Sequence, residues 1–153
     1  MAGDAATRIA REVDRANYDL RARVNEALRR GTDGLPVSGW ALKEMLGHVA
    51  FWEEAAVPVI LHMLRGTAIP GGWRFGSGYV PAGEWPAADV HNAREAAWAA
   101  DQPIQTVLLR WDEAHSGLLG VLATVTEDEA VRHSDYFGGL SAHLREHAAG
   151  LAT

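Results

Sequence analysis

Hydrophobic and polar residues alternate along most of this chain with a period of three to four positions, which is typical of amphipathic helices. Residues 5–30 show the pattern first, with charged residues on the opposite face. Their apolar positions are Ile9, Val13, Ala16, Leu20, Val24, Ala27 and Leu28. The pattern predicts a helix that ends in "GTDGLP" at 31–36, because glycine and proline interrupt helices.

A second helix is predicted from an N-cap at Ser38 to about Arg65. Its apolar positions are Leu42, Met45, Val49, Trp52, Ala56, Ile60 and Met63. Pro58 lies inside this pattern and removes one backbone hydrogen bond. We expect a kink rather than an end at Pro58, since the apolar pattern continues beyond it.

Residues 66–88 follow no period and are rich in glycine, proline and aromatic residues. A loop of this length inside a compact domain is usually functional, as a lid, a pocket wall or an interface. A poorly ordered surface loop is the alternative. The loop contains Trp73, Phe75, Tyr79 and Trp85, side chains that favour burial.

Two further helices are predicted after this loop. Asp89 is placed to cap a short helix over 90–100. Pro103 fits the first turn of a longer helix that reaches about Thr124. Its apolar face carries Val107, Leu108, Trp111, His115, Leu118 and Leu122.

The C-terminal part of the chain contains one local motif and one last helix. "TEDE" at 126–129 predicts a capping box that opens a short turn. "RHSDYFGG" at 132–139 predicts a break, and the last helix is expected over 139–151.

The predicted fold is all-α, because no segment shows a convincing strand pattern. Four main helices with a long crossover loop between the second and third predict a four-helix bundle. A chain of 153 residues suits one domain, so we expect residues 1–153 to form a single bundle.

Composition excludes several classes of function. The formal net charge is −6, and no basic stripe is present, which argues against nucleic-acid binding. The chain has no cysteine, which excludes disulfides, thiolate ligands and a cysteine nucleophile. The N-terminus lacks the apolar region of a secretory signal, and no stretch is long and apolar enough to span a membrane, so we expect a cytoplasmic protein.

The segment "SAHLREHAAG" (141–150) carries the most specific candidate chemistry. His143 and His147 are four residues apart, at the edge of the apolar face of the last helix, where two imidazoles can converge on one cation. His48 has the same relation to the apolar face of its own helix. Imidazole nitrogen suits zinc, nickel, iron or copper. The alternative is that these are hydrogen-bonded histidines of the core or its rim.

Three segments together resemble the DinB/YfiT-like superfamily: "WALKEMLGHVAFWEE" (40–54), "HNAREAAWAADQP" (91–103) and "SAHLREHAAG" (141–150). The superfamily includes mycothiol- and bacillithiol-dependent transferases and the metal-binding domain of mycothiol-dependent maleylpyruvate isomerase. The resemblance covers nearly the whole chain. It implies a four-helix bundle and a divalent metal site, with zinc or nickel favoured, whose ligands are His48, His143 and His147.

The resemblance also places "NAR" (92–94) near the pocket. His91 stands where the family usually has phenylalanine, and it either adds a polar group near the site or faces solvent. As residues that bind substrate we expect Asn92, Arg94, Arg74 and Trp52. No residue is assigned as a catalytic acid, base or nucleophile.

Other polar residues near the histidines receive weaker assignments. Glu44, one turn before His48, is expected to orient its ring. His115 points inward, as a core-edge histidine bonded to a backbone carbonyl or as a supporting residue of the site. Exposed positions are expected for His62, His133, Glu53 and Glu146.

The functional hypothesis is a metal-dependent transferase or isomerase that uses a low-molecular-weight thiol. Because the protein has no cysteine, the thiol must be a cosubstrate that reacts with a small electrophile. Arginine outnumbers lysine, with Lys43 the one lysine, which favours a GC-rich genome and a mycothiol-like thiol. The alternatives are a metal-water or metal-free hydrolase of the same superfamily and a non-catalytic binding protein of the stress response. A homodimer is plausible because the chain has six tryptophans.

Overall fold

The structure is a computed structural model, and it describes residues 4–31, 36–37, 40–68 and 88–151. The described residues form six helices and one antiparallel pair of two-residue strands, β1 (Pro36–Val37) and β2 (Trp40–Ala41). The prediction of an all-helical chain is confirmed apart from this short pair. The chain divides into two compact units, Met1–Leu42 with Leu122–Thr153, and Lys43–Val121. Each is described by itself.

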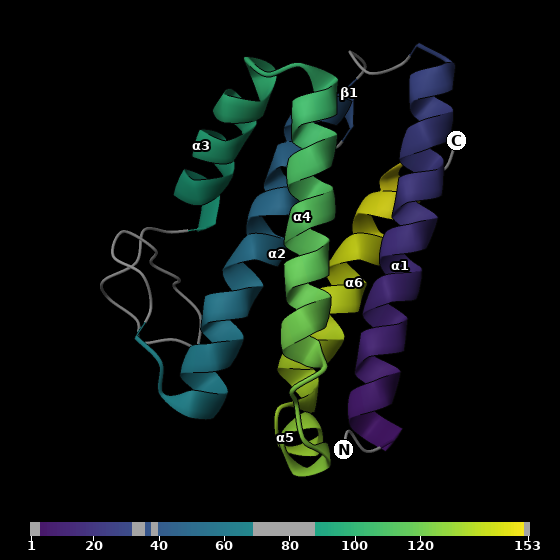
Figure 1. The fold of residues 1–153 in the computed structure, drawn as a ribbon. Coiled ribbons are helices and arrows are strands. Elements are labelled where there is room, and N and C mark those ends of the chain that lie inside the picture. The colour runs from purple at the N-terminus through teal and green to yellow at the C-terminus, as the bar shows by residue number, and fades with distance from the viewer. Residues whose placement is uncertain (1–3, 32–35, 38–39, 69–87, 152–153) are drawn as a thin grey trace. The chain divides into compact units, whose positions relative to one another are not determined.

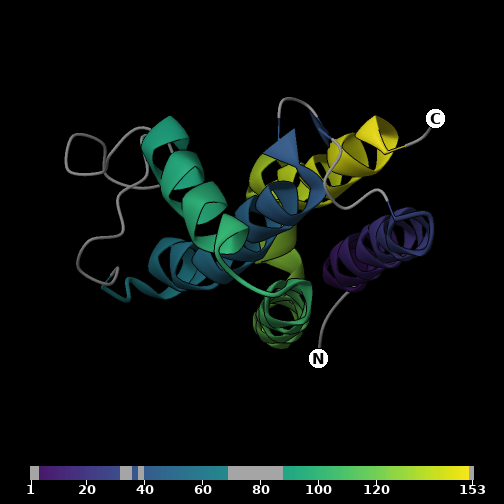
Figure 2. The ribbon, with the colours of Figure 1, turned by 90° about the horizontal axis from the view of Figure 1, so that it is seen from above.

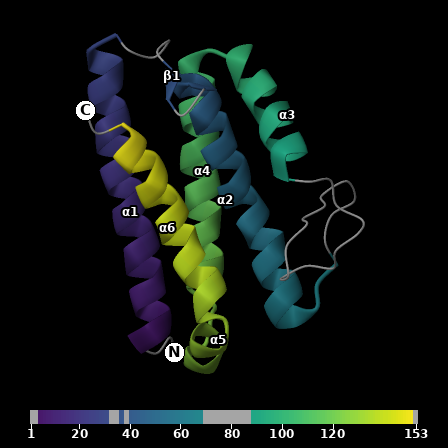
Figure 3. The same ribbon diagram turned by 180° about the vertical axis from the view of Figure 1, so that it is seen from behind.

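The first unit contains α1 (Asp4–Arg29), α5 (Glu127–Arg132) and α6 (Ser134–Gly150). Helix α1 lies along α6 (Figures 1 and 3). The buried residues of α1 are Ala6, Val13, Ala16, Leu20 and Val24, and those of α6 are Phe137, Ser141, Leu144 and Ala148. Both sets recur at helical spacing, which confirms the predicted apolar face of α1. Gly31, just past the end of α1, has a φ of +72°, which suits glycine.

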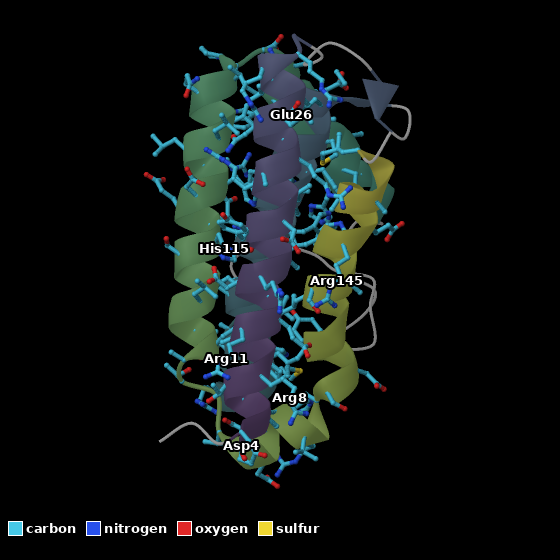
Figure 4. All side chains as sticks on the ribbon, turned by 90° about the vertical axis from the view of Figure 1, so that its right-hand side faces the viewer. Asp4, Arg8, Arg11, Glu26, His115 and Arg145 are labelled. Atoms are coloured by element: carbon cyan, nitrogen blue, oxygen red, sulfur yellow. The ribbon has the colours of Figure 1, made fainter. Side chains whose placement is uncertain are left out.

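Helix α5 lies at the N-terminal end of α1 and is hydrogen-bonded to its first turn. The predicted capping box is present: the Thr126 hydroxyl accepts from the Glu129 backbone, and the Glu129 carboxylate accepts from the Thr126 backbone. Beside it, the Glu127 carboxylate accepts a 2.8 Å hydrogen bond from the backbone N–H of Ala5. Figure 4 marks Asp4 at this end of α1. A carboxylate here satisfies a backbone donor of the first turn and complements the helix dipole.

Helix α6 begins earlier than the sequence predicts. It starts at Ser134 rather than Gly139, so the expected break over 132–139 is wrong, and only His133 separates α5 from α6. Gly138 and Gly139 lie inside the helix. Their helix propensity is low, but Phe137 beside them is 1% exposed, and burial of its ring offsets that local cost.

The second unit contains α2 (Leu42–Arg65), α3 (Ala88–Ala100) and α4 (Ile104–Leu122). The first residue of α2 and the last residue of α4 belong to the first unit. Figure 2, in which α4 is seen nearly end-on, shows the short connection that joins α3 to α4. All three helices were predicted, but α3 begins at Ala88, so Asp89 lies inside this helix and the prediction that it is the N-cap is wrong. Pro103 lies one residue before α4, and its carbonyl accepts from the backbone of Thr106 and Val107.

Several predictions lie outside the described residues. These are the N-cap at Ser38 and most of the loop over 66–88, with Trp73, Arg74, Phe75, Tyr79 and Trp85. Among the helices of the described part of the chain, none combines the length and apolar character needed to cross a membrane.

Burial along α2 is wider than the single predicted face. The buried residues include the further positions Leu46, Ala50, Phe51, Ala55 and Val59. Trp52 and Met63, which were predicted to be part of the apolar face, are only partly buried. The helix continues through Pro58, as expected. A helix that is apolar on most sides lies in the interior of a protein, so its buried polar residues need hydrogen-bond partners.

Gly47 is the point of closest approach between α2 and α3. A Cβ added at Gly47 would lie 2.6 Å from the Ala99 Cβ and 2.9 Å from the carbonyl oxygen of Glu95. Both distances are shorter than a van der Waals contact. Glycine at position 47 therefore sets how closely α3 packs on α2.

We expect Gly47→Ala to lower the free energy of unfolding by about 1–3 kcal/mol, because the added methyl group overpacks the contact with α3. Urea denaturation followed by circular dichroism measures the change. Gly117→Ala on α4 is the matched control, since a Cβ there meets nothing within 4 Å. The control should gain about 0.5–1 kcal/mol from helix propensity. Equal stability gains in both variants would contradict the close approach.

Candidate metal centre and buried polar network

His143 and His147 form a close pair on α6. Their Nε2 atoms are 3.1 Å apart, and the ring planes meet at 84° with centroids 4.6 Å apart. Both rings are half-buried, beside the fully buried Leu144 and the buried Ala148. The predicted position at the edge of the apolar face is confirmed.

The geometry of this pair suits two ligands of one cation. With each nitrogen about 2.1 Å from a shared ion, a separation of 3.1 Å corresponds to an angle of about 95° at the ion. This angle lies between the octahedral and tetrahedral values. Burial lowers the pKa of His147 below its usual 6.5, with Glu146 acting more weakly in the opposite direction. Neutral imidazole is the form that binds a metal.

His48 on α2 is 7% exposed and is held by α3. Its Nδ1 lies 2.8 Å from the Oδ1 of Asn92, and the Nε1–H of Trp52 donates to the same oxygen at 2.6 Å. The ring of Trp52 also meets the His48 ring edge-on, with centroids 6.5 Å apart. Both Asn92 and Trp52, which the sequence predicts to bind substrate, therefore lie in contact with His48. Their role in binding substrate stays a prediction.

The sequence led us to expect that Glu44 orients the His48 ring, but the hydrogen-bond partner of His48 Nδ1 is another residue. That partner is Asn92, which lies 44 positions along the chain. The acceptor at His48 Nδ1 comes from the neighbouring helix α3 rather than from the preceding turn of α2. No local spacing on α2 indicates this partner.

His91 and Arg94 flank Asn92 on α3. His91 has no exposed surface, so the alternative in which it faces solvent is wrong. Its ring stacks on Phe51 at 5.2 Å with an interplanar angle of 18°. The Arg94 guanidinium lies over the Phe51 ring, with its Cζ 5.0 Å from the ring centroid, and it forms a 3.0 Å ion pair with Glu95.

Among the described residues, three histidines are candidate ligands of a metal ion: the close pair His143 and His147 on α6, and His48 on α2. All three donors are imidazole nitrogens, a set that suits zinc or nickel better than magnesium or calcium. His143 and His147 belong to the first unit and His48 to the second. In comparisons with known proteins, no family model, curated protein or solved structure matches this chain.

A second polar cluster lies inside the second unit, around Glu53. This carboxylate is 4% exposed, so its predicted position on a solvated face is wrong. One oxygen accepts from Trp111 Nε1 at 2.8 Å, and the other lies 2.8 Å from His115 Nδ1. His115, marked on α4 in Figure 4, is buried as predicted, and the partner of its Nδ1 is the Glu53 carboxylate.

Arg110 links the three helices of the second unit. Its guanidinium makes two 2.7 Å hydrogen bonds to Glu54 on α2 and one of 2.7 Å to Glu95 on α3, and it stacks over Trp98 at 4.5 Å. Burial by itself lowers the pKa of Arg110, but hydrogen bonds and charges from Glu54 and Glu95 raise it above the usual value. The residue therefore stays a cation, and bidentate pairing gives it a fixed geometry.

The remaining acidic and histidine predictions have mixed outcomes. Glu146 is exposed, as expected. His62 and His133 are half-buried rather than fully exposed. The His62 Nδ1 lies 3.1 Å from the carbonyl oxygen of Thr67, just beyond the end of α2.

We expect Glu53→Gln to lower the free energy of unfolding by about 1–3 kcal/mol. Glutamine keeps one acceptor for the Trp111 N–H, but its amide N–H can pair with His115 Nδ1 only if that nitrogen carries no proton, so the buried network is weakened. Chemical denaturation gives the difference. Glu113→Gln, an exposed change on α4, is the control and should stay within about 0.5 kcal/mol of the parent protein. A Glu53 variant as stable as this control would argue against the network.

Proposed function

We propose that the protein is a divalent-metal-dependent enzyme in which His48, His143 and His147 bind one zinc or nickel ion. The observation that carries the proposal is the pair of imidazoles on α6, whose Nε2 atoms lie 3.1 Å apart, and we propose His48 as the third ligand. We further propose a DinB-like four-helix bundle of α1, α2, α4 and α6, with a crossover between α2 and α3. Such a bundle would bring α2 and α6 to the same ion.

The donor chemistry supports an open site rather than a closed one. Structural zinc sites use four protein ligands, whereas catalytic sites use three and leave a position for an outside molecule. The lowered pKa of His147 favours the neutral ligand form near pH 7. When bound, a divalent cation lowers the pKa of a coordinated thiol or water toward neutrality.

The proposed reaction is transfer of a low-molecular-weight thiol to a small electrophile, or a thiol-dependent isomerisation. In the transfer, the S–H bond of the thiol breaks and its sulfur bonds to an electrophilic carbon, such as that of an activated double bond or an epoxide. The π bond or C–O bond of the electrophile opens, and the atom that takes its electron pair receives the proton. The thiol comes from outside because the chain contains no cysteine. Resemblance to the DinB-like superfamily supports a mycothiol-like thiol, and Arg94 and Arg74 are proposed to bind acidic groups of the substrate.

We expect the purified protein, stripped with a chelator and reloaded, to retain one zinc or nickel ion per chain after gel filtration. Elemental analysis gives the ratio and competition with a chromophoric chelator gives the affinity. His143→Leu should weaken binding by at least tenfold, because two imidazoles do not complete the ligand set. His62→Leu is the control and should bind as the parent does. Equal binding by both variants would contradict the assignment.

We expect thiol conjugation to disappear when the metal is removed and to return when it is restored. A panel of electrophiles with mycothiol or a related thiol, followed by loss of thiol and by mass spectrometry of the products, measures this. Products that form without thiol would indicate hydrolysis instead. Conjugation that continues in the metal-free protein would contradict the proposed chemistry.

A further inference from the structure

We propose that Asn92 is the positioning residue of the metal centre. Its side-chain oxygen holds His48 as the Nδ1–H tautomer, so that Nε2 is the ligand atom. The role of Nε2 as a metal ligand rests on the proposed function. The contacts that fix the tautomer, however, lie entirely within the second unit.

The identity of the Asn92 atom follows from Trp52. An indole N–H can only donate, and it points at the Asn92 side chain at 2.6 Å. That atom is therefore the amide oxygen rather than the nitrogen, which removes the usual ambiguity of an asparagine side chain.

The tautomer of His48 follows in the same way. His48 Nδ1 lies 2.8 Å from an atom that can only accept, so Nδ1 must carry the proton. In a neutral imidazole the other nitrogen, Nε2, then carries the lone pair. A metal-binding histidine commonly donates its second N–H to a carbonyl or carboxylate, which fixes the ring and its tautomer.

The surroundings of Asn92 hold it in place. On one side, His91 stacks on Phe51 and meets Trp52 edge-on at 5.9 Å. On the other side, Glu95 is bonded to Arg110 at 2.7 Å. The close approach of α3 at Gly47 brings this part of the helix against α2. These contacts hold α3 against α2 on both sides of Asn92, so its amide reaches His48 from a fixed part of the helix.

The first experiment reads the tautomer in the metal-free protein. Nitrogen-15 NMR of the histidine side chains in alkaline buffer, where imidazole is neutral, distinguishes Nδ1–H from Nε2–H. The His48 signals are identified by their loss in His48→Leu. We expect the parent protein to show His48 as Nδ1–H and Asn92→Ala to show a mixture. Alanine favours helix, so this variant should fold.

Two further variants separate positioning from a general effect on structure. Asn92→Asp retains an acceptor and should restore the Nδ1–H tautomer. Trp52→Phe removes the donor that fixes the orientation of the Asn92 amide, so His48 should show a mixture of tautomers in this variant, as in Asn92→Ala. Asn25→Ala, an exposed change on α1, is the matched control and should leave His48 unchanged.

The second experiment measures cobalt(II) binding by visible absorption. We expect Asn92→Ala to weaken cobalt binding by about 10–100-fold and to alter the d–d bands, as loss of a ligand's hydrogen-bond partner does. Asn92→Asp should bind within a few-fold of the parent. Binding by Asn92→Ala equal to that of Asn25→Ala would overturn the role of Asn92 at the metal.

The two experiments distinguish failure of this inference from failure of the proposed function. If the parent binds no metal but its His48 tautomer depends on Asn92, the metal site is wrong and the control of the ring by Asn92 stands. If the parent binds metal and the tautomer is the same in Asn92→Ala, the metal site stands and this inference is wrong.

Discussion

The burial of α2 is the constraint on which the second unit depends. A polar side chain on a buried face of this helix has no access to solvent, so it must find a partner inside the protein. His48 meets Asn92 from α3, and Glu53 meets His115 from α4. Arg110 does the same for the acidic residues around it. The polar contacts that satisfy α2 are also the contacts that join it to its two neighbours, so the packing of the unit and the orientation of its candidate ligand have one physical origin.

The helices could be predicted from the sequence because their signals are local. Apolar spacing identified α1, and the capping box at Thr126 formed as expected. Two predictions failed where distant packing outweighs local preference. The glycines before Leu140 indicated a break, but burial of Phe137 extends α6 through them. Glu53 looked solvated because a single helix period cannot show that α4 covers that side of α2.

The residues of the candidate site also differ in whether local sequence signals could predict them. His143 and His147 could be paired from sequence, because residues four apart on a helix are neighbours whatever surrounds them. His48 entered the site through its place beside an apolar face and through a family resemblance. The task of Asn92 could not be predicted from spacing, because it depends on how two helices meet and on which atom of an amide faces a ring. Orientation of a ligand is a property of tertiary contacts, whereas its residue type is visible in the chain.

The hydrogen bond from Ala5 to Glu127 has a consequence for the order of events during synthesis. Its two partners are 122 positions apart, so the N-terminal turn of α1 leaves the ribosome long before its acceptor exists. Until then an amphipathic helix of 26 residues has neither its cap nor the apolar face of α6 to cover it. The apolar face of this segment therefore stays without its α6 partner until those later residues have been made, a stage at which exposed apolar surface favours aggregation.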